Sequence, residues 1–270
     1  MRFLKLIFNF YINSSIHVGL SCYALVRMTQ HMFHIPEDDA VANFAFFGTS
    51  VGYNFVKYDA LARVQRLQMR KELKMIALFS FFALFLVGYY FCQLQRITQI
   101  VAVVFLSITL LYTLPFFPNK KNARNWAGVK IYIVALCWVG VTLALPVLNA
   151  DISITSDFYL KCLQRFILIF VLVLIFEIID LAKDDPHLQT VPQQIGVKRT
   201  KIVGLLLLVP FYFLEFFKSN FDKNQLIINL FLVIIISFFM LFANEKRSKY
   251  YTSFFVESVP IVWWLMVFFF

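Results

Sequence analysis

Three carboxylates lie at the end of one apolar segment of the chain. Within residues 170–185, which read FVLVLIFEIIDLAKDD, Glu177, Asp180 and Asp184 are spaced i, i+3 and i+7. On a helix these spacings place the three side chains within about 60° of one another. Mg²⁺ is commonly held by one or two carboxylates together with the phosphates of a substrate. The pattern therefore predicts a Mg²⁺ site at a helix end, with a phosphorylated lipid as the substrate that brings the metal.

The alternative is a solvated helix end that is acidic without any function. A helix C-terminus disfavours anions, because the helix dipole is negative there. Like charges at i, i+3 and i, i+4 also repel each other by about 0.2–0.5 kcal/mol per pair. The presence of the three carboxylates despite both energetic costs favours the functional interpretation. In that interpretation Glu177, Asp180 and Asp184 bind the metal, and Asp180 and Asp184 are the catalytic residues.

The composition is that of a membrane protein. Of the 270 residues, 61% are hydrophobic and 34 are Phe, whereas soluble domains are about 45–50% apolar. The mean hydropathy is +0.76. The length suits one compact bundle and leaves no room for a sizeable soluble domain. We therefore predict an all-α, multi-pass membrane domain over residues 1–270.

Nine segments are long and apolar enough to be predicted as membrane spans. They are about 5–27, 39–57, 74–94, 97–117, 130–149, 159–179, 201–218, 225–244 and 251–269. The first of them resembles a signal peptide at its start. No small-x-small cleavage site follows and the apolar run continues, so it is interpreted as a membrane helix.

The basic residues predict the orientation of these spans. With nine spans, 19 of the 25 Lys and Arg residues fall on the side that carries the N-terminus. The positive-inside rule makes that side cytoplasmic. The net charge of +10 is then a topology signal, and nucleic acid is not an expected partner. The pattern suits a bacterial inner membrane, with the lipid bilayer as the surroundings of the protein.

A short polar segment follows the carboxylates. Residues 190–199 read TVPQQIGVKR, with Pro192 and Gly196 as turn residues before the next span. Lys198 and Arg199 could meet a diphosphate, or they could be ordinary basic flanks of a cytoplasmic loop.

These motifs resemble the UbiA superfamily of membrane prenyltransferases. The pattern Glu177-x-x-Asp180-x-x-x-Asp184, followed by Thr190-x-Pro192 and a Gly, is similar to that family's second aspartate-rich motif, D-x-x-D-x-x-x-D with T-L-P and Gly. Residues 110–115, LLYTLP, resemble its L-Y-S-x-P stretch, and Lys130 with residues 138–140 (WVG) fits its fifth helix. Nine helices with both motif loops on the cytoplasmic side also match.

The resemblance implies a fold and an activity. Members of the family transfer an isoprenyl group from its diphosphate to an acceptor, which is usually an aromatic ring and sometimes a lipid. Two carboxylate motifs hold Mg²⁺ on the diphosphate, and basic residues neutralise the leaving group. For this chain the implied substrate contacts are Asn54, Lys57, Arg124, Lys130 and Lys198. The acceptor is not identified by the sequence.

The first carboxylate motif of the family, N-D-x-x-D-x-x-x-D, is degraded in this chain. Asn54 fits, but Phe55, Tyr58 and Ala62 occupy the three carboxylate positions. Asp59 is one residue out of register, about 100° around the helix. Lys57, with Arg63 and Arg66, could supply fixed positive charge in place of a second metal.

Two functions therefore remain open. The first is a Mg²⁺-dependent prenyltransferase, and the second is a non-catalytic relative that binds a polyprenyl lipid or a membrane partner. A transporter is less favoured, because no interrupted spans suggest inverted repeats. Three further polar residues are singled out: His17 as a site residue or a hydrogen-bonded core histidine, Arg165 as a snorkelling side chain, and Glu257 as an interfacial residue.

Overall fold

The computed structural model describes residues 2–64, 71–113, 128–184, 186–219 and 221–269, with the backbone alone for residues 2, 3, 59–64 and 186. These residues form helices and no strand. In chain order the elements are α1 (Arg2–Asn13), α2 (Ile16–Met32), α3 (Asp39–Val64), α4 (Lys71–Gln93), α5 (Arg96–Thr113), α6 (Lys130–Val139), the π-helix η3 (Gly140–Ala144), α7 (Leu145–Asn149), α8 (Ser156–Asp180), η4 (Pro186–Leu188), α9 (Val191–Ile195), α10 (Val197–Phe213), η5 (Leu214–Phe217), α11 (Lys223–Phe242), the π-helix η6 (Tyr251–Val256) and α12 (Val259–Met266).

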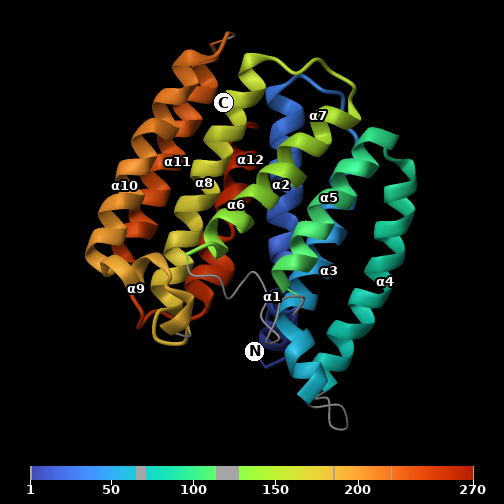
Figure 1. The fold of residues 1–270 in the computed structure, drawn as a ribbon, viewed down its shortest axis with the longest axis vertical. Helices are drawn as coiled ribbons and strands as arrows, with labels where there is room; N and C mark the ends of the chain where they lie inside the picture. Colours follow the sequence, from blue (N-terminus) through green and yellow to red (C-terminus); the bar gives the residue numbers. More distant parts are fainter. Residues whose placement is uncertain (1, 65–70, 114–127, 185, 220, 270) are drawn as a thin grey trace.

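The helices run up and down in one bundle (Figure 1). Helices α4 and α5 lie on one flank, α10 and α11 on the other, and α2, α6, α8 and α12 between them. The end of the bundle where α1 begins and α8 ends is called the lower end, as it is drawn in Figure 1; the other is the upper end. Helices α3, α5 and α8 end at the lower end, and α6, α10 and η6 begin there.

Six of the described helices are long and apolar enough to cross a membrane. They are Lys71–Gln93, Arg96–Thr113, Lys130–Asn149, Ser156–Asp180, Val197–Phe217 and Lys223–Phe242. All six coincide with predicted spans, which supports an integral membrane protein. The predicted total of nine spans stays a prediction.

The first predicted span, 5–27, was wrong as a single helix. The chain breaks at Ser14 and Ser15 into α1 and α2, and Ser15 adopts a left-handed backbone with φ 59°. Asn54 of α3 donates to the carbonyl oxygen of Ser14 at 2.9 Å, which satisfies part of the interrupted backbone. Apolarity alone does not reveal such a break, because the residues on both sides of it are apolar.

Close packing depends on small residues where two helices meet. A Cβ added to Gly19 of α2 would lie 2.2 Å from Ser50 Oγ and 2.8 Å from the carbonyl oxygen of Phe46, both on α3. A Cβ on Gly140 would overlap the Phe105 ring of α5 at 2.0 Å. Membrane helices associate largely through packing of this kind, since lipid gives them no hydrophobic drive to pair. The glycines thus fix the spacing of the helices that carry the polar residues described next.

Candidate functional site

The acidic end of α8 meets a lysine at the lower end. Lys130 begins α6, and its Nζ lies 3.7 Å from Oδ2 of Asp184, just beyond the end of α8. Both side chains are mostly buried, with exposed fractions of 21% and 14%. The structure therefore brings together two residues that the sequence singled out separately.

Glu177 has a different position from the two aspartates. It is 2% exposed, and its Oε2 accepts a hydrogen bond of 3.1 Å from the backbone N–H of Val191, at the start of α9. Gln193 accepts from the backbone N–H of Thr190 at 2.9 Å. Glu177 also lies within electrostatic range of Lys130 and Asp184. Its carboxylate thus ties the segment after α8 back onto the helix.

Asp180 and Asp184 are the carboxylates that a ligand could reach. Asp180 is 42% exposed, and its partner in the structure is Lys183, at 3.5 Å. Asp184 Oδ2 is enclosed and has no hydrogen-bond partner among the described residues, although Lys130 is nearby. A buried carboxylate oxygen without a donor is unusual, because burying a polar group without a hydrogen bond is costly. It is a vacant acceptor position beside a lysine.

A second pair of charges lies on the other side of this end. Lys57 of α3 interacts electrostatically with Glu257, which follows the π-helix η6. Tyr11 and Tyr53 also interact electrostatically with Glu257, and Lys249 interacts electrostatically with Lys57. In the described part of the chain, neither Lys57 nor Glu257 forms a hydrogen bond or ion pair through its side chain. Both keep accessible surface, so they border space that water can enter.

A hydrogen bond between two aromatic residues links the helices that carry these groups. Trp138 of α6 donates from Nε1 to the hydroxyl oxygen of Tyr53 on α3, at 3.0 Å. Tyr53 lies one helical turn before Lys57, on the upper side of it. Lys130 is two turns below Trp138 along α6. The Trp138–Tyr53 bond therefore lies above both groups of charges.

The fold has a solved counterpart. A structure of a digeranylgeranylglyceryl phosphate synthase in membranes superposes with a TM-score of 0.58 over 100% of this chain and 97% of that chain, at 15% identity. That synthase is a membrane prenyltransferase of the UbiA superfamily. The chain has a UbiA-like fold. The sequence matches no family model and no curated protein.

In this UbiA-like bundle, Asn54 is held in the helix packing. It is 4% exposed, and its Nδ2 donates to the Ser14 carbonyl oxygen and to Ser80 Oγ, each at 2.9 Å. Its Oδ1 has no partner among the described residues. The amide nitrogen therefore has a structural role, and a substrate contact through Asn54 would have to use Oδ1.

The remaining predicted contacts are less well defined. Lys198 is exposed at the start of α10, after Gly196. Arg124 lies outside the described residues, as do the side chains of Asp59 and Arg63 and the whole of Arg66. The hydroxyl of Tyr58 donates to the carbonyl oxygen of Asn13 at 2.8 Å, and Phe55 is 39% exposed. Phe55 and Tyr58 stand at carboxylate positions of the family motif, but no described contact joins either side chain to Asp180.

The predicted three-carboxylate metal site is not assembled as such in the described part of the chain. No group of three or more His, Cys, Asp or Glu side chains there could hold a metal ion. Glu177 is engaged with α9, which leaves Asp180 and Asp184. Two carboxylates plus substrate phosphates are still a usual ligand set for Mg²⁺. The Oδ2 of Asp184, which accepts no hydrogen bond from the described residues, fits that set, and the site itself stays a prediction.

Two interpretations of single residues are settled by the structure, and a third is not. Arg165 does not snorkel: it is 2% exposed and donates to Thr142 Oγ1 at 2.9 Å and to the Leu25 carbonyl oxygen at 3.2 Å. His17 is a hydrogen-bonded core histidine, bonded to the Tyr11 hydroxyl at 2.7 Å. Glu257 follows η6 and keeps accessible surface, so its assignment as an interfacial residue stays a prediction.

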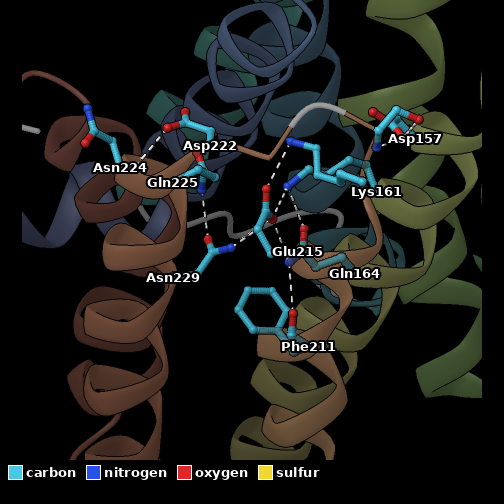
Figure 2. Close-up of polar contacts among 11 residues, drawn as sticks. Asp157, Lys161, Gln164, Phe211, Glu215, Asp222, Asn224, Gln225 and Asn229 are labelled. Carbon is cyan, nitrogen blue, oxygen red and sulfur yellow. Dashed lines mark hydrogen bonds and ion pairs between the residues drawn. The ribbon is translucent and has the colours of Figure 1, made fainter.

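A buried polar network at the upper end was missed by the sequence analysis (Figure 2). Glu215 is fully buried and receives Lys161 Nζ at 2.6 Å, Lys218 Nζ at 3.0 Å and Asn229 Nδ2 at 3.0 Å. Gln225 donates to Asn229 Oδ1 at 2.8 Å. Each of the polar side-chain atoms named here has a partner, and the network joins α8, η5 and α11. The signal in the sequence was Gln225 and Asn229, four residues apart in an apolar span.

Proposed function

We propose that this protein is an intramembrane prenyltransferase, which transfers an isoprenyl group from a prenyl diphosphate to a lipid or aromatic acceptor. The supporting observation is the vacant Asp184 oxygen beside Lys130 at the lower end of a UbiA-like bundle. The structural neighbour is named for a product with two geranylgeranyl groups on glyceryl phosphate. A geranylgeranyl diphosphate is therefore the first substrate to test.

The residues divide the work by charge. Lys130 and Lys57 would lie against the diphosphate and stabilise the negative charge that grows on it as the allylic bond breaks. Lys198, which is exposed, would contribute at the mouth of the site. The Trp138–Tyr53 bond would close the polar chamber on its upper side. The prenyl chain would then continue into the apolar part of the bundle.

Mg²⁺ would be held by Asp180 and Asp184 together with diphosphate oxygens. When bound, it would neutralise the diphosphate and make it a better leaving group. Glu177 would act indirectly, by keeping the segment before α9 folded against α8. We also propose that the lower end faces the cytoplasm, on the basis of the basic residues that the loops at that end carry.

The test is Mg²⁺-dependent binding of geranylgeranyl diphosphate to the detergent-purified protein, measured by calorimetry. The double variant Asp180→Asn/Asp184→Asn should lose this binding. Asp151→Asn is a matched control, because Asp151 is an exposed aspartate between α7 and α8 at the upper end. Binding that is unchanged in the double variant, or independent of Mg²⁺, would exclude this site.

A non-catalytic UbiA-like protein is the second candidate. Two residues expected to face the substrate, Glu177 and Asn54, make structural contacts instead. A chain that binds a polyprenyl lipid without transferring it would bind the diphosphate but release no diphosphate ion over time. Measuring released diphosphate in the binding experiment separates the two candidates.

A further inference from the structure

The π-helix η6 places a carboxyl group inside the bundle. In η6 the wide turn from Tyr251 to Val256 ends at Glu257, whose backbone N–H donates to the Thr252 carbonyl oxygen at 3.0 Å. Single π-turns of this kind occur often at functional sites. The turn is fixed from the side by α2, which determines where Glu257 lies.

Two side chains of α2 hold this turn. His17 Nε2 lies 2.9 Å from the carbonyl oxygen of Phe254 and 3.1 Å from Ser258 Oγ. Ser21 Oγ donates to the backbone carbonyl oxygen of Glu257. These contacts use the backbone around Glu257 and leave its carboxyl group unengaged. A carboxyl group whose backbone is fixed and whose oxygens are free is positioned for a ligand.

One cation and two phenols lie within electrostatic range of the Glu257 carboxyl group. Lys57 is the cation that interacts with it, from α3; Tyr53 and Tyr11 are the phenols, from α3 and α1. Two other groups lie near these residues. Lys249 interacts electrostatically with Lys57, and His17 lies within hydrogen-bond distance of Ser258, the residue after Glu257. An ionisable residue within a membrane bundle is costly and marks a site by default. Glu257 is such a residue, and its carboxyl group points to a role in binding or chemistry.

We propose, building on the prenyl transfer proposed above, that Glu257 is the proton acceptor for a hydroxyl-bearing acceptor. The acceptor's O–H would donate to a Glu257 carboxylate oxygen, while Lys57 turns from Glu257 to the diphosphate. With an alcohol as the acceptor, the oxygen that gives its proton to Glu257 is also the atom that attacks C1 of the prenyl group.

The step balances without any further reactant. The bond between C1 of the prenyl group and the diphosphate oxygen breaks, and its electron pair leaves with the diphosphate. The acceptor oxygen forms a new bond to C1, and its proton passes to Glu257. Glu257 then releases the proton to water in the space that it borders. The product is a prenyl ether, and Glu257 returns to the carboxylate form.

The test uses two hydroxyl acceptors that need no prior identification, water and glycerol. The full-length protein is incubated with geranylgeranyl diphosphate, Mg²⁺ and glycerol, and the prenyl glyceryl ether and prenol are quantified as a function of pH. The wild-type rate should rise with pH as Glu257 loses its proton. Glu257→Gln should lower the rate about 100-fold or more, in the range of general base catalysis. Glu257→Asp should recover part of it.

Binding of the diphosphate distinguishes this role from the proposed function and from a structural one. Glu257→Gln should bind geranylgeranyl diphosphate as the wild type does and unfold at the same temperature. Glu245→Gln, at an exposed glutamate between α11 and η6, is the matched control and should change neither rate nor pH profile. A wild type that binds no diphosphate would refute prenyl transfer itself. A wild type that binds but forms no product, or a Glu257→Gln variant with the wild-type rate and pH profile, would refute the role of Glu257 alone.

Discussion

The two ends of the bundle treat buried charge in opposite ways. At the upper end, Glu215 is fully buried and accepts from four side chains, namely Lys161, Gln164, Lys218 and Asn229. At the lower end, Asp184 keeps a buried oxygen that accepts no hydrogen bond from the described residues, and the Glu257 carboxyl group has no described hydrogen bond or ion pair. Both ends contain lysines and carboxylates. They differ in whether the polar atoms are already satisfied.

This difference separates structure from function better than burial does. A network with every atom paired stabilises one arrangement of helices and has nothing left to offer a ligand. Unpaired polar atoms cost stability, and a protein retains them where a ligand completes them. By this criterion Asp184 and Glu257 are candidates for chemistry, whereas Lys161 and Glu215 are structural although they are more deeply buried.

The largest expected effect comes from breaking the upper network. Glu215→Leu leaves Lys161 and Lys218 buried without a counter-charge, and losing one partner of a buried pair costs about 3–5 kcal/mol. Thermal unfolding in detergent would measure the loss. Protein that remains folded should still bind geranylgeranyl diphosphate with wild-type affinity. Weakened binding in that fraction would show that the two ends are coupled, and the comparison would fail.

A triple variant tests whether charge or packing matters at this end. Lys161→Met/Glu215→Leu/Lys218→Met removes all three charges at once. Replacing a whole buried ionic group with apolar residues of similar volume is often neutral or stabilising. We expect stability close to that of the wild type. A triple variant as unstable as Glu215→Leu would mean that the network does more than satisfy its own charges.

A smaller effect is expected at Gly196, between α9 and α10. Its backbone has φ 80° and ψ 156°, a region that is essentially restricted to glycine. Gly196→Ala should cost about 1–3 kcal/mol and loosen the segment that Glu177 holds. Gly48→Ala is the control, because a Cβ there meets nothing within 4 Å and alanine favours a helix. Equal unfolding temperatures for the two variants would contradict the assigned strain.

The smallest effect sharpens the description of the lower end. Lys130→Met removes the lysine beside Asp184 and should weaken diphosphate binding about tenfold, which is 1.4 kcal/mol. Lys198→Met, at an exposed lysine of the same end, should have a smaller effect. Neither change should alter the unfolding temperature much, because Lys130 lies 3.7 Å from Asp184 without a hydrogen bond and Lys198 is exposed. Similar losses in both variants would mean that general positive charge binds the diphosphate rather than Lys130 specifically.

The class of fold could be predicted well from the sequence, because the fold class depends on local properties of the chain. Apolar length gave the helices and their order, and six of the predicted spans are confirmed as membrane-type helices. The spacing of Asp180 and Asp184 gave the acidic end of α8, and the structure added Lys130 beside it. The apolar spans and the carboxylate spacing are local signals, because the residues that make up each of them are close together along the chain.

What the sequence did not give depends on contacts between distant residues. The Lys161–Glu215 pair joins residues 54 positions apart, and the contact of Arg165 with Leu25 joins residues 140 apart. Counting charges could assign Lys161 and Arg165 to one side of the membrane, but it could not show that other helices pack around them. The backbone of Glu257 is likewise held by α2, which lies at the other end of the chain.

The separation of Lys161 and Glu215 along the chain has a consequence for how the protein is made. Helix α8 is synthesised before η5, so during translation Lys161 would enter the bilayer region without its carboxylate. A charged residue in an inserting helix is unfavourable by several kcal/mol at the membrane centre and less so near the edge. Helix α8 is therefore expected to wait beside the insertion machinery until α10 and η5 follow. The two helices would then leave into lipid as a paired unit.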